Sequence, residues 1–443
     1  MSIVPKVVKT LQGVFGSCAE SANEETKVIK RRRKFTPQTL AAAFILALLR
    51  NPKANSEQIA AMAAASGVVV SHQAVEQRYS PELAEFFKIL FSKMTQQVVH
   101  SNESLAPILE RFSEVNVIDS SMITLPDSQQ EEYQGCGGSY EGGKAALKLQ
   151  TELNLRNGDL RCVQIEPGRS PDAATDRQQI VFTKGSLRLA DLGYFNIRVF
   201  QEIDRCEAYY LSRVQHQTKI YVGGVKYDLV PWLNSLGDGV IDQQVEIGST
   251  DRLGCRLIAW RVPEEVANRR RQKLIASTRK KHGRQPTAAS LAACDWEFLV
   301  TNLLEDQLTI KEAIVLYRAR WQIELLFKRW KSHCQIDELD GRNDIIQMTR
   351  FWARLCAMLI QHWLSIAASW SSTLRVSLGK TAKLTRDFAK DMAIGLSDNG
   401  YLTTILERFR QMAHATCKLT KRKKKPATLD QLRDPDQLEY VLT

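Results

Sequence analysis

The sequence YRARWQIELLFKRWK, which occupies Tyr317–Lys331, contains neither Gly nor Pro and is rich in residues that favour an α-helix. On a helix, Tyr317, Arg320, Glu324 and Lys331 share one stripe that is about 60° wide. The stripe beside it is apolar and is therefore predicted to be buried; it is formed by Leu316, Ile323, Phe327 and Trp330. The pattern places one carboxylate among a phenol, a guanidinium and an ammonium group on one side of a packed helix.

A surface helix with solvated charges is the alternative, and an Arg320–Glu324 pair on it contributes only about 0.3 kcal/mol. The spacing Tyr-x2-Arg-x3-Glu-x6-Lys, with Trp321 directly after Arg320, counts against that alternative. It resembles the signature of bacterial insertion-sequence transposases of the DDE type, in the group named after insertion sequence four. The resemblance implies that Glu324 is a third metal-binding carboxylate and that Tyr317, Arg320 and Lys331 hold DNA phosphates.

Such a site needs two earlier aspartates, and the chain contains a candidate for each. Val115–Ser121 is a short β-branched run that predicts a buried strand with Asp119 at its end. Asp191 follows Ala190 and begins an Asp-x-Gly-Tyr-Phe stretch. Taken singly, an aspartate is more often a loop or cap residue. Both stretches, however, are similar to the aspartate motifs of this family, which implies that Asp119, Asp191 and Glu324 are the catalytic, metal-binding carboxylates.

The pattern around these aspartates predicts an α/β fold. Asn157-Gly158 is a strong hairpin turn between two strand-like segments. Three strands in hairpin order, then a helix, then a strand followed by Asp191, are typical of a ribonuclease-H-like core, a mixed sheet flanked by helices. Asp119 and Asp191 are then expected at the ends of adjacent central strands. The elements concerned are strands at 115–121, 146–155, 160–165 and 187–189, and a helix near 176–182.

About a hundred residues separate this part of the chain from Glu324, far more than a loop requires. They are rich in strands, predicted at 208–214, 218–221, 227–229, 243–247 and 255–260, with Gly237-Asp238-Gly239 among the turns. They resemble the β-rich insertion domain of the family. A basic helical segment after Pro263 either forms a solvated face or, as we expect, contacts phosphates. The cations assigned to DNA binding there are Arg269, Arg270, Arg271, Lys273, Lys280 and Lys281.

Two tryptophans match positions that contact bases in the family. Trp296 opens a strand at 296–301, and Trp321 follows the signature arginine. The resemblance implies that Trp296 stacks on a base flipped from the duplex and that Trp321 wedges the base stack. Stacking on an unpaired base contributes about 1–3 kcal/mol, which helps to offset unstacking. Core packing remains open as the alternative for Trp296.

The N-terminal part is predicted to be helical and to bind DNA. Arg31, Arg32 and Arg33 precede Thr36-Pro37, an N-cap and first-turn pair that opens a helix at 38–49. Helices at 56–65 and from Ser71 to residue 79 flank a Ser-Gly turn, which is the outline of a helix-turn-helix. Any α-hairpin can match that outline. Further helices are expected at 351–370, 380–391 and 401–413, before a basic run at 421–425.

These patterns divide the chain into five expected regions. They are a helical N-terminal DNA-binding region (1–113), the first part of the catalytic core (114–195), a β-rich insertion domain (196–295), the second part of the core (296–345), and a helical C-terminal region with a basic tail (346–443).

The composition agrees with a nucleic-acid partner. Lys and Arg number 61 against 49 acidic residues, which gives a net charge of +12. That excess favours a polyanionic partner, although charge for solubility is the alternative. Nine cysteines occur without a CxxC pair, so neither a zinc site nor a disulfide framework is indicated. With no signal-peptide layout and no long apolar run, we expect a cytoplasmic bacterial protein associated with the nucleoid.

The resemblance implies a DNA transposase that cuts and pastes an insertion sequence at its terminal inverted repeats through a hairpin intermediate. Two Mg²⁺ ions, for which Mn²⁺ substitutes, suit an all-carboxylate site. The expected partners are double-stranded terminal-repeat DNA, target DNA and a second copy of the chain. No nucleotide cofactor is expected, because no GxxxxGK[ST] motif is present. The alternatives are a non-catalytic DNA-binding regulator or relic, and another ribonuclease-H-fold nuclease.

Overall fold

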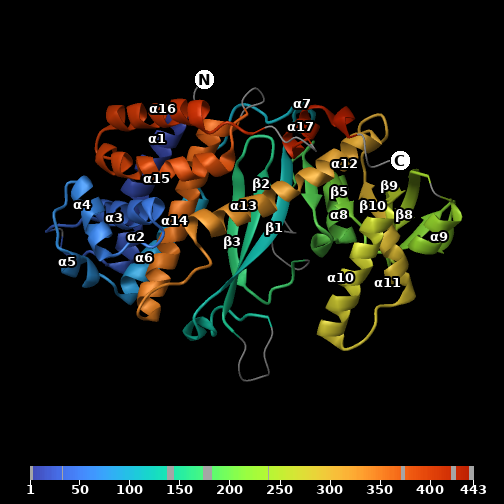
Figure 1. Cartoon of the computed structure of the whole chain (residues 1–443), viewed down its shortest axis with the longest axis horizontal. Coiled ribbons are helices and arrows are strands. Elements are labelled where there is room, and N and C mark those ends of the chain that lie inside the picture. The colour runs from blue at the N-terminus through green and yellow to red at the C-terminus, as the bar shows by residue number, and fades with distance from the viewer. Residues whose placement is uncertain are drawn as a thin grey trace. The chain divides into compact units, whose positions relative to one another are not determined.

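The computed structural model describes residues 3–31, 33–136, 144–172, 182–237, 239–370, 375–420 and 426–438. These residues form a mixed α/β protein with one large mixed sheet and many helices (Figure 1), which confirms the predicted class. The chain divides into two units. The first unit comprises Met1–Leu105, Ser120–Ser170 and Gln322–Lys421, and the second comprises Ala106–Asp119, Pro171–Trp321 and Arg422–Thr443.

The N-terminal part of the first unit is helical, as predicted. The Thr36 side chain accepts a hydrogen bond from the Thr39 amide and so caps α3, with Pro37 in its first turn. Ser71 caps α5 in the same way. Gly67, at φ +82°, turns the chain after α4. The helices are α1 (Val4–Gly13), α2 (Ala19–Thr26), α3 (Pro37–Arg50), α4 (Ser56–Ala65), α5 (His72–Glu76) and α6 (Pro81–Thr95).

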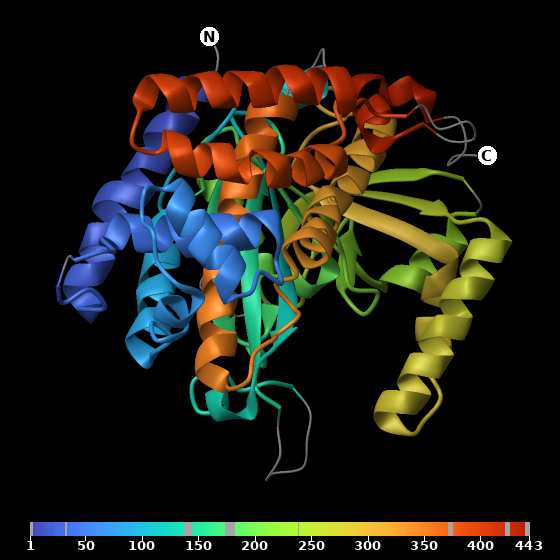
Figure 2. The ribbon, with the colours of Figure 1, turned by 60° about the vertical axis from the view of Figure 1, so that its left-hand side comes forward.

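A long buried helix, α14 (Asp344–Ser369), is the centre of the first unit. It begins at Asp344, after its N-cap Asn343 and seven residues before the helix predicted from the sequence, and packs against α6 and α3. The helices α15 (Leu378–Gly395) and α16 (Asn399–Thr416) run side by side (Figure 2). No helix among the described residues is long and apolar enough to cross a membrane.

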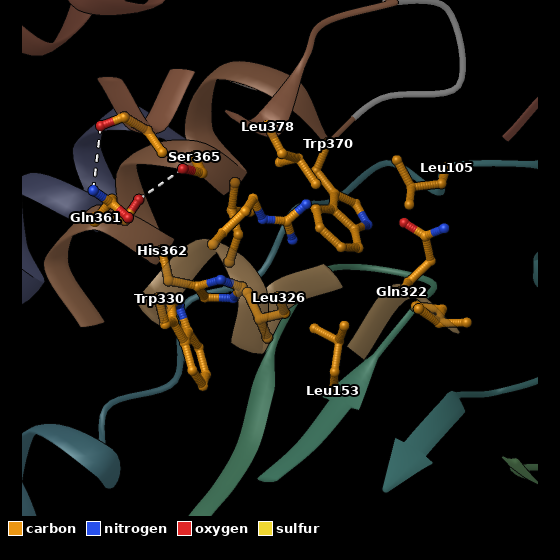
Figure 3. Close-up of a pocket in the computed structure, with 14 residues that line it drawn as sticks. Leu105, Leu153, Gln322, Leu326, Trp330, Gln361, His362, Ser365, Trp370 and Leu378 are labelled. Atoms are coloured by element: carbon orange, nitrogen blue, oxygen red, sulfur yellow. Dashed lines mark hydrogen bonds between the residues drawn. The ribbon is translucent and has the colours of Figure 1, made fainter. Parts of the chain in front are cut away.

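A small, mostly apolar pocket lies between α14 and the neighbouring elements of the first unit (Figure 3). Its volume is about 40 Å³, which is room for water rather than for a nucleotide. Two polar groups in its wall are bonded within the fold: His362 Nε2 donates to the Gly158 carbonyl oxygen at 2.8 Å, and Trp370 Nε1 donates to the Arg156 carbonyl oxygen at 3.1 Å. This pocket therefore belongs to the core.

The strands of the second unit follow the order β1-β4-β5-β10-β9-β8-β6-β7. The pairs β1–β4 and β4–β5 are parallel, and the remaining pairs are antiparallel. The strands are β1 (Val115–Thr124), β4 (Leu187–Ala190), β5 (Tyr209–Arg213), β6 (Lys219–Val222), β7 (Val225–Asp228), β8 (Ile241–Ile247), β9 (Leu253–Arg261) and β10 (Trp296–Thr301). The strand-rich character predicted for residues 196–295 is thus confirmed.

In the first unit, β2 (Ala146–Asn154) and β3 (Leu160–Pro167) form the predicted antiparallel hairpin, and β2 neighbours β1. Gly158 adopts φ +81° in the turn between them, a conformation that favours glycine. The strand β1 itself passes from the second unit into the first after Asp119.

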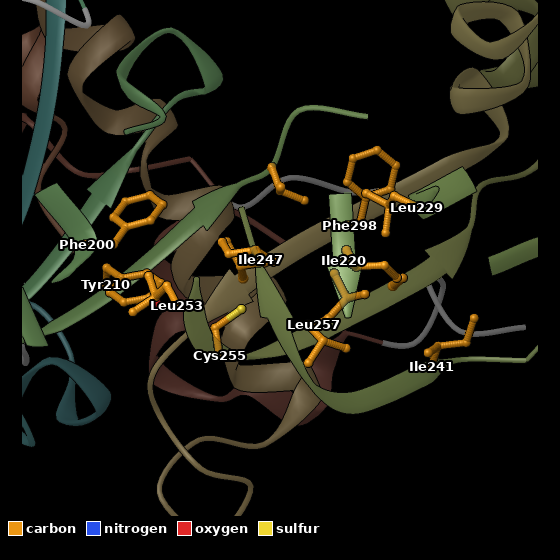
Figure 4. Packing of buried hydrophobic residues seen from close by; sticks show 14 of the residues in the cluster. Phe200, Tyr210, Ile220, Leu229, Ile241, Ile247, Leu253, Cys255, Leu257 and Phe298 are labelled. Atoms are coloured by element: carbon orange, nitrogen blue, oxygen red, sulfur yellow. The ribbon is translucent and has the colours of Figure 1, made fainter. Parts of the chain in front are cut away.

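A cluster of buried side chains from β5, β6, β8, β9 and β10 and from the helices α8 (Ile197–Arg205) and α9 (Leu229–Ser235) forms the core of the second unit (Figure 4). Within it, the rings of Phe200 and Tyr210 stack with centroids 4.4 Å apart. Arg256 is almost fully buried and donates to both carboxylate oxygens of Asp242, at 2.7 and 2.6 Å, and to the Leu308 carbonyl oxygen. Through Arg256, β9 is thus bonded to Leu308, which lies just before the signature helix α12 (Ile310–Ala319).

The α-helices described in the second unit are short, except for α10. They are α7 (Pro107–Glu110), α8 (Ile197–Arg205), α9 (Leu229–Ser235), α10 (Glu264–His282), α11 (Ala288–Ala292), α12 (Ile310–Ala319) and α17 (Thr428–Arg433). Several predicted features fall outside the described residues: most of the helix near 176–182, Asp238 of the Gly237–Gly239 turn, Arg32, and the basic run 421–425.

We predict a pH-dependent contribution to stability from His362. Burial lowers its pKa from 6.5 to about 4, so between these values the unfolded chain binds a proton that the folded chain does not. The free energy of unfolding should therefore fall by about 1 kcal/mol per unit as the pH drops through this window. In urea titrations, His362→Gln, whose amide can still donate to Gly158, should show a shallower slope. Equal slopes for both proteins would contradict the prediction.

Candidate active site

The parallel pairing of β1 with β4 brings two aspartates to neighbouring positions. Ile118 lies opposite Ala190 in the register, so Asp119 and Asp191, the next residues, occupy the same end of the paired segment. The sequence predicted this arrangement. It placed Asp119 at the end of its strand, whereas β1 continues to Thr124. The Asp119 carboxylate therefore lies directly after the part of β1 that pairs with β4, and not at the end of the strand.

The signature helix provides one contact to each aspartate. Tyr317 Oη donates to Asp191 Oδ1 at 3.4 Å, and Arg320 Nη1 lies 3.7 Å from Asp119 Oδ2. The Arg320 guanidinium is also 5.9 Å from the centre of the Tyr317 ring. Arg320 is only 8% exposed, so its charge interacts with Asp119 with little screening by solvent. All four residues lie in the second unit.

The phenol of Tyr317 is held in its protonated form. Burial raises its pKa, and the negative charge of Asp191 raises it further. A protonated phenol remains a hydrogen-bond donor across the physiological pH range, so Tyr317 can donate to an anionic oxygen, as it does to Asp191.

The stretch Tyr317–Lys331 is not the single helix predicted from the sequence. The helix α12 ends at Ala319, and the Arg320 amide donates to the Tyr317 carbonyl oxygen at 3.1 Å, a tighter 3₁₀-type bond. A second helix, α13, spans Trp321–Arg329, and a π-helical turn follows at Trp330–Cys334. The Arg320 backbone keeps helical angles, φ −50° and ψ −34°, so the change at this residue is in the hydrogen-bonding pattern.

The other two signature residues lie in the first unit. Glu324 is partly buried on α13, and Lys331 lies in the π-helical turn. Lys331 Nζ donates to the Met122 carbonyl oxygen of β1 at 3.1 Å. Within the described part of the chain, no group of three or more His, Cys, Asp or Glu side chains is arranged to hold a metal. The structure thus brings together Asp119, Asp191, Tyr317 and Arg320.

The oxygen ligands that this site offers indicate which class of metal ion would fit. Asp119 and Asp191 provide carboxylate oxygens, and no histidine or cysteine is among the residues named above. Carboxylate oxygens suit hard cations such as Mg²⁺ and Mn²⁺ better than soft ones.

A cleft of about 570 Å³ in the second unit opens beside Tyr317 and Arg320. Trp321, which is 55% exposed, lies at this cleft. The wall combines apolar and aromatic side chains with three arginines; it is formed by Trp260, Val262, Pro263, Val266, Arg270, Glu297, Leu299, Ile314, Tyr317, Arg318, Arg320, Trp321, Thr428 and Gln431. A cationic cleft with aromatic walls suits part of a DNA strand.

Several cleft residues were not identified from the sequence. Glu297 holds Arg270 and also accepts from Arg213 at 2.8 Å, so it orients the arginines. Trp260 lies opposite Glu297 in the β9–β10 register. Gln431 comes from the C-terminal segment. None of these residues belongs to a motif, and only tertiary contacts bring them together.

Trp296 and Trp321 occupy very different surroundings. Trp296 is 1% exposed and belongs to the core of the second unit. Its Nε1 donates to Asn234 Oδ1 at 2.9 Å, and the Arg261 guanidinium lies 4.6 Å from its ring centre. These contacts support core packing, the alternative that the sequence left open for Trp296. Trp321, by contrast, is largely exposed to solvent.

The basic residues of α10 divide into paired and solvent-facing groups. Arg270 bonds to Glu297, and Arg271 bonds to Asp295. Arg269, Lys273 and Lys280 are exposed, whereas the side chain of Lys281 lies outside the described ones. Before α3, Arg31 and Arg33 are exposed too.

Comparison with known proteins identifies the chain's relatives. Residues 110–360 match the family model described as the transposase DDE domain. The chain is 28% identical over 340 residues to the transposase for insertion sequence element IS231F of Bacillus thuringiensis subsp. israelensis, a match that covers 72% of this chain and 71% of that protein. It is 26% identical over 320 residues to the transposase for insertion sequence element IS1151 of Clostridium perfringens, which covers 65% of each chain.

We predict effects of very different size on the free energy of unfolding for the two tryptophans. Trp296→Ala removes a buried side chain and should lower the free energy of unfolding by about 3–5 kcal/mol. Trp321→Ala, as the exposed control, should change it by less than about 0.5 kcal/mol. Urea unfolding monitored by circular dichroism measures both. An unchanged stability for Trp296→Ala would show that this side chain is not part of the core.

Proposed function

Since the chain belongs to the transposases with a DDE domain and is the transposase of an insertion sequence, we propose that it moves its element by cut-and-paste chemistry at Asp119, Asp191 and Glu324. The observation that carries this proposal is the Ile118–Ala190 pairing. It sets two carboxylates side by side on parallel strands, and each of them contacts one residue of the signature.

The strand order supports a ribonuclease-H-like core. The first unit contributes β3-β2-β1 and the second β1-β4-β5, with β1, β4 and β5 parallel. We propose that residues 114–195 and 296–345 belong to this core, together with β5, which pairs in parallel with β4, and that the rest of residues 196–295, from β6 to α11, is the insertion domain. Residues 1–113 and 346–443 are then its helical N- and C-terminal regions.

The chain position of Glu324 supports its role as the third carboxylate. It follows Arg320 by four residues, which is about one helical turn, and Arg320 contacts Asp119. Burial of the neighbouring Ile323 and Phe327 fixes α13 in the first unit. The backbone that carries the Glu324 carboxylate is therefore fixed by core packing.

Members of this family generally use divalent metal ions, and the carboxylate donors fit Mg²⁺, with Mn²⁺ as a substitute. When bound, such ions would supply Lewis-acid chemistry that activates the attacking oxygen and neutralises the leaving one. Asp119, Asp191 and Glu324 would hold them. Arg320 and Lys331 would bind phosphates, the former as a fork and the latter as a point charge. Tyr317 would donate a hydrogen bond to a phosphate oxygen.

The reaction would proceed by successive attacks on phosphorus. Water first cleaves the 3′ end of the element, and the released 3′-hydroxyl attacks the opposite strand to form a hairpin. Water then opens the hairpin, and the 3′-hydroxyl attacks target DNA. Each step forms one P–O bond, breaks another, and transfers a proton from the attacking oxygen to the leaving one. The same groups can therefore serve every step.

The DNA is proposed to follow the exposed cations. Arg269, Lys273 and Lys280 on α10, together with Arg31 and Arg33, would neutralise phosphates, and Trp321 would insert beside an unpaired base. The α4–turn–α5 segment would supply end recognition, and two copies of the chain would bind the two ends of the element.

We predict that Asp119→Ala, Asp191→Ala and Glu324→Ala each reduce Mg²⁺-dependent cleavage by about three orders of magnitude or more, because each removes a metal ligand. Binding of the terminal repeat should remain largely intact. A gel assay on a duplex that carries the repeat measures cleavage, and a mobility shift measures binding.

The matched control for these variants is Asp251→Ala, which removes an exposed carboxylate of the same unit that pairs with Arg198. It should cleave as the wild type does. Cleavage retained by any one of the three site variants would remove that residue from the proposed set.

A further inference from the structure

The C-terminal segment, residues 426–438, packs on the signature helix. Its helix α17 lies against α12 and α7 (Figure 1). Leu432 is 2% exposed and Leu438 is 5% exposed, so both anchor the segment in the second unit. Asp436 adds an ion pair with Lys311 of α12, with Nζ and Oδ1 3.0 Å apart. The segment is therefore a fixed part of this unit.

Two residues of this segment line the cleft beside Arg320 and Trp321. Thr428 and Gln431 are three positions apart on α17, so they share one face of the helix. Both are partly buried. Their hydroxyl and amide groups can donate as well as accept hydrogen bonds. This face of the segment is polar and carries no formal charge.

The acidic residues of the same segment are engaged elsewhere. Asp430 accepts from the Ala427 amide at 3.3 Å, Asp434 accepts from Gln437 at 3.1 Å, and Asp436 pairs with Lys311. A lid that excludes DNA would be expected to present carboxylates to the arginines of the cleft. Here the segment presents Thr428 and Gln431 instead, and about 570 Å³ of the cleft stays open. It forms a wall of the cleft and does not plug it.

We propose that Gln431, assisted by Thr428, contacts a base of the DNA strand held in this cleft and contributes to sequence preference. The inference rests on the proposed function. A glutamine amide can form two hydrogen bonds with adenine, one as donor and one as acceptor. Trp321, in the same wall and 55% exposed, supplies aromatic surface on which a base can stack. The C-terminal segment is then a specificity element directly beside the catalytic residues.

The test uses the full chain and short duplexes that differ only in one unpaired nucleotide, which is dA, dC, dG or dT. Fluorescence anisotropy gives the dissociation constants. The wild type should bind the dA duplex about tenfold more tightly than the other three. Gln431→Ala should bind all four within about twofold of one another, because it loses the bidentate contact. The matched control is Gln437→Ala, which alters an exposed glutamine of the same segment and should keep the preference.

A wild type without base preference, or Gln431→Ala with the wild-type preference, would overturn the proposal. Leu432→Ala should loosen the segment and so shows whether the segment supports DNA binding or blocks it. If the segment is a wall of the cleft, this variant should bind all four duplexes more weakly. Tighter binding would show that the segment blocks the cleft and would overturn the proposal as well. The proposed function is tested separately, because Asp191→Ala must lose cleavage whatever Gln431 does. A failure of the proposed function and a failure of the Gln431 contact are therefore distinguishable.

Discussion

The parallel pairing of β1 with β4 is the constraint on which the site depends. It fixes Ile118 opposite Ala190, and the two carboxylates that follow are held close together by the backbone. Neighbouring like charges in a partly buried place are unfavourable unless a cation or donor faces them. The helix α12 meets this need, because it presents Arg320 to Asp119 and Tyr317 to Asp191. If metal ions bound these carboxylates, Arg320 and Tyr317 would be free to bind phosphates.

Much of this arrangement could be predicted from the sequence, because strong local signals mark it. A β-branched run before Asp119, an Asn-Gly turn and the caps Thr36 and Ser71 each specify structure within a few residues. The spacing from Tyr317 to Lys331 pointed to the same family that the comparisons identify. Local pattern and family signature were sufficient for the strands, the caps and the neighbouring aspartates.

The features that were missed depend on tertiary contacts. The change in hydrogen bonding of the signature helix at Arg320 has no Gly or Pro to mark it. A tryptophan at the start of a strand fits a core or a stacking surface equally well, and the burial of Trp296 among β-strands favours the first. The sequence of the basic helix α10 does not show that Glu297 and Asp295 pair with two of its arginines. The short helix α17 lacks any periodic pattern, and its contacts with α12 make Gln431 relevant to the cleft.

The most direct measurement is anomalous diffraction from crystals of the chain bound to its terminal-repeat DNA and Mn²⁺. We expect two manganese peaks about 3.5–4 Å apart, with oxygens of Asp119, Asp191 and Glu324 as ligands and Arg320 on a phosphate. Manganese bound without Glu324, or aspartate side chains directed away from the metal, would contradict a three-carboxylate site.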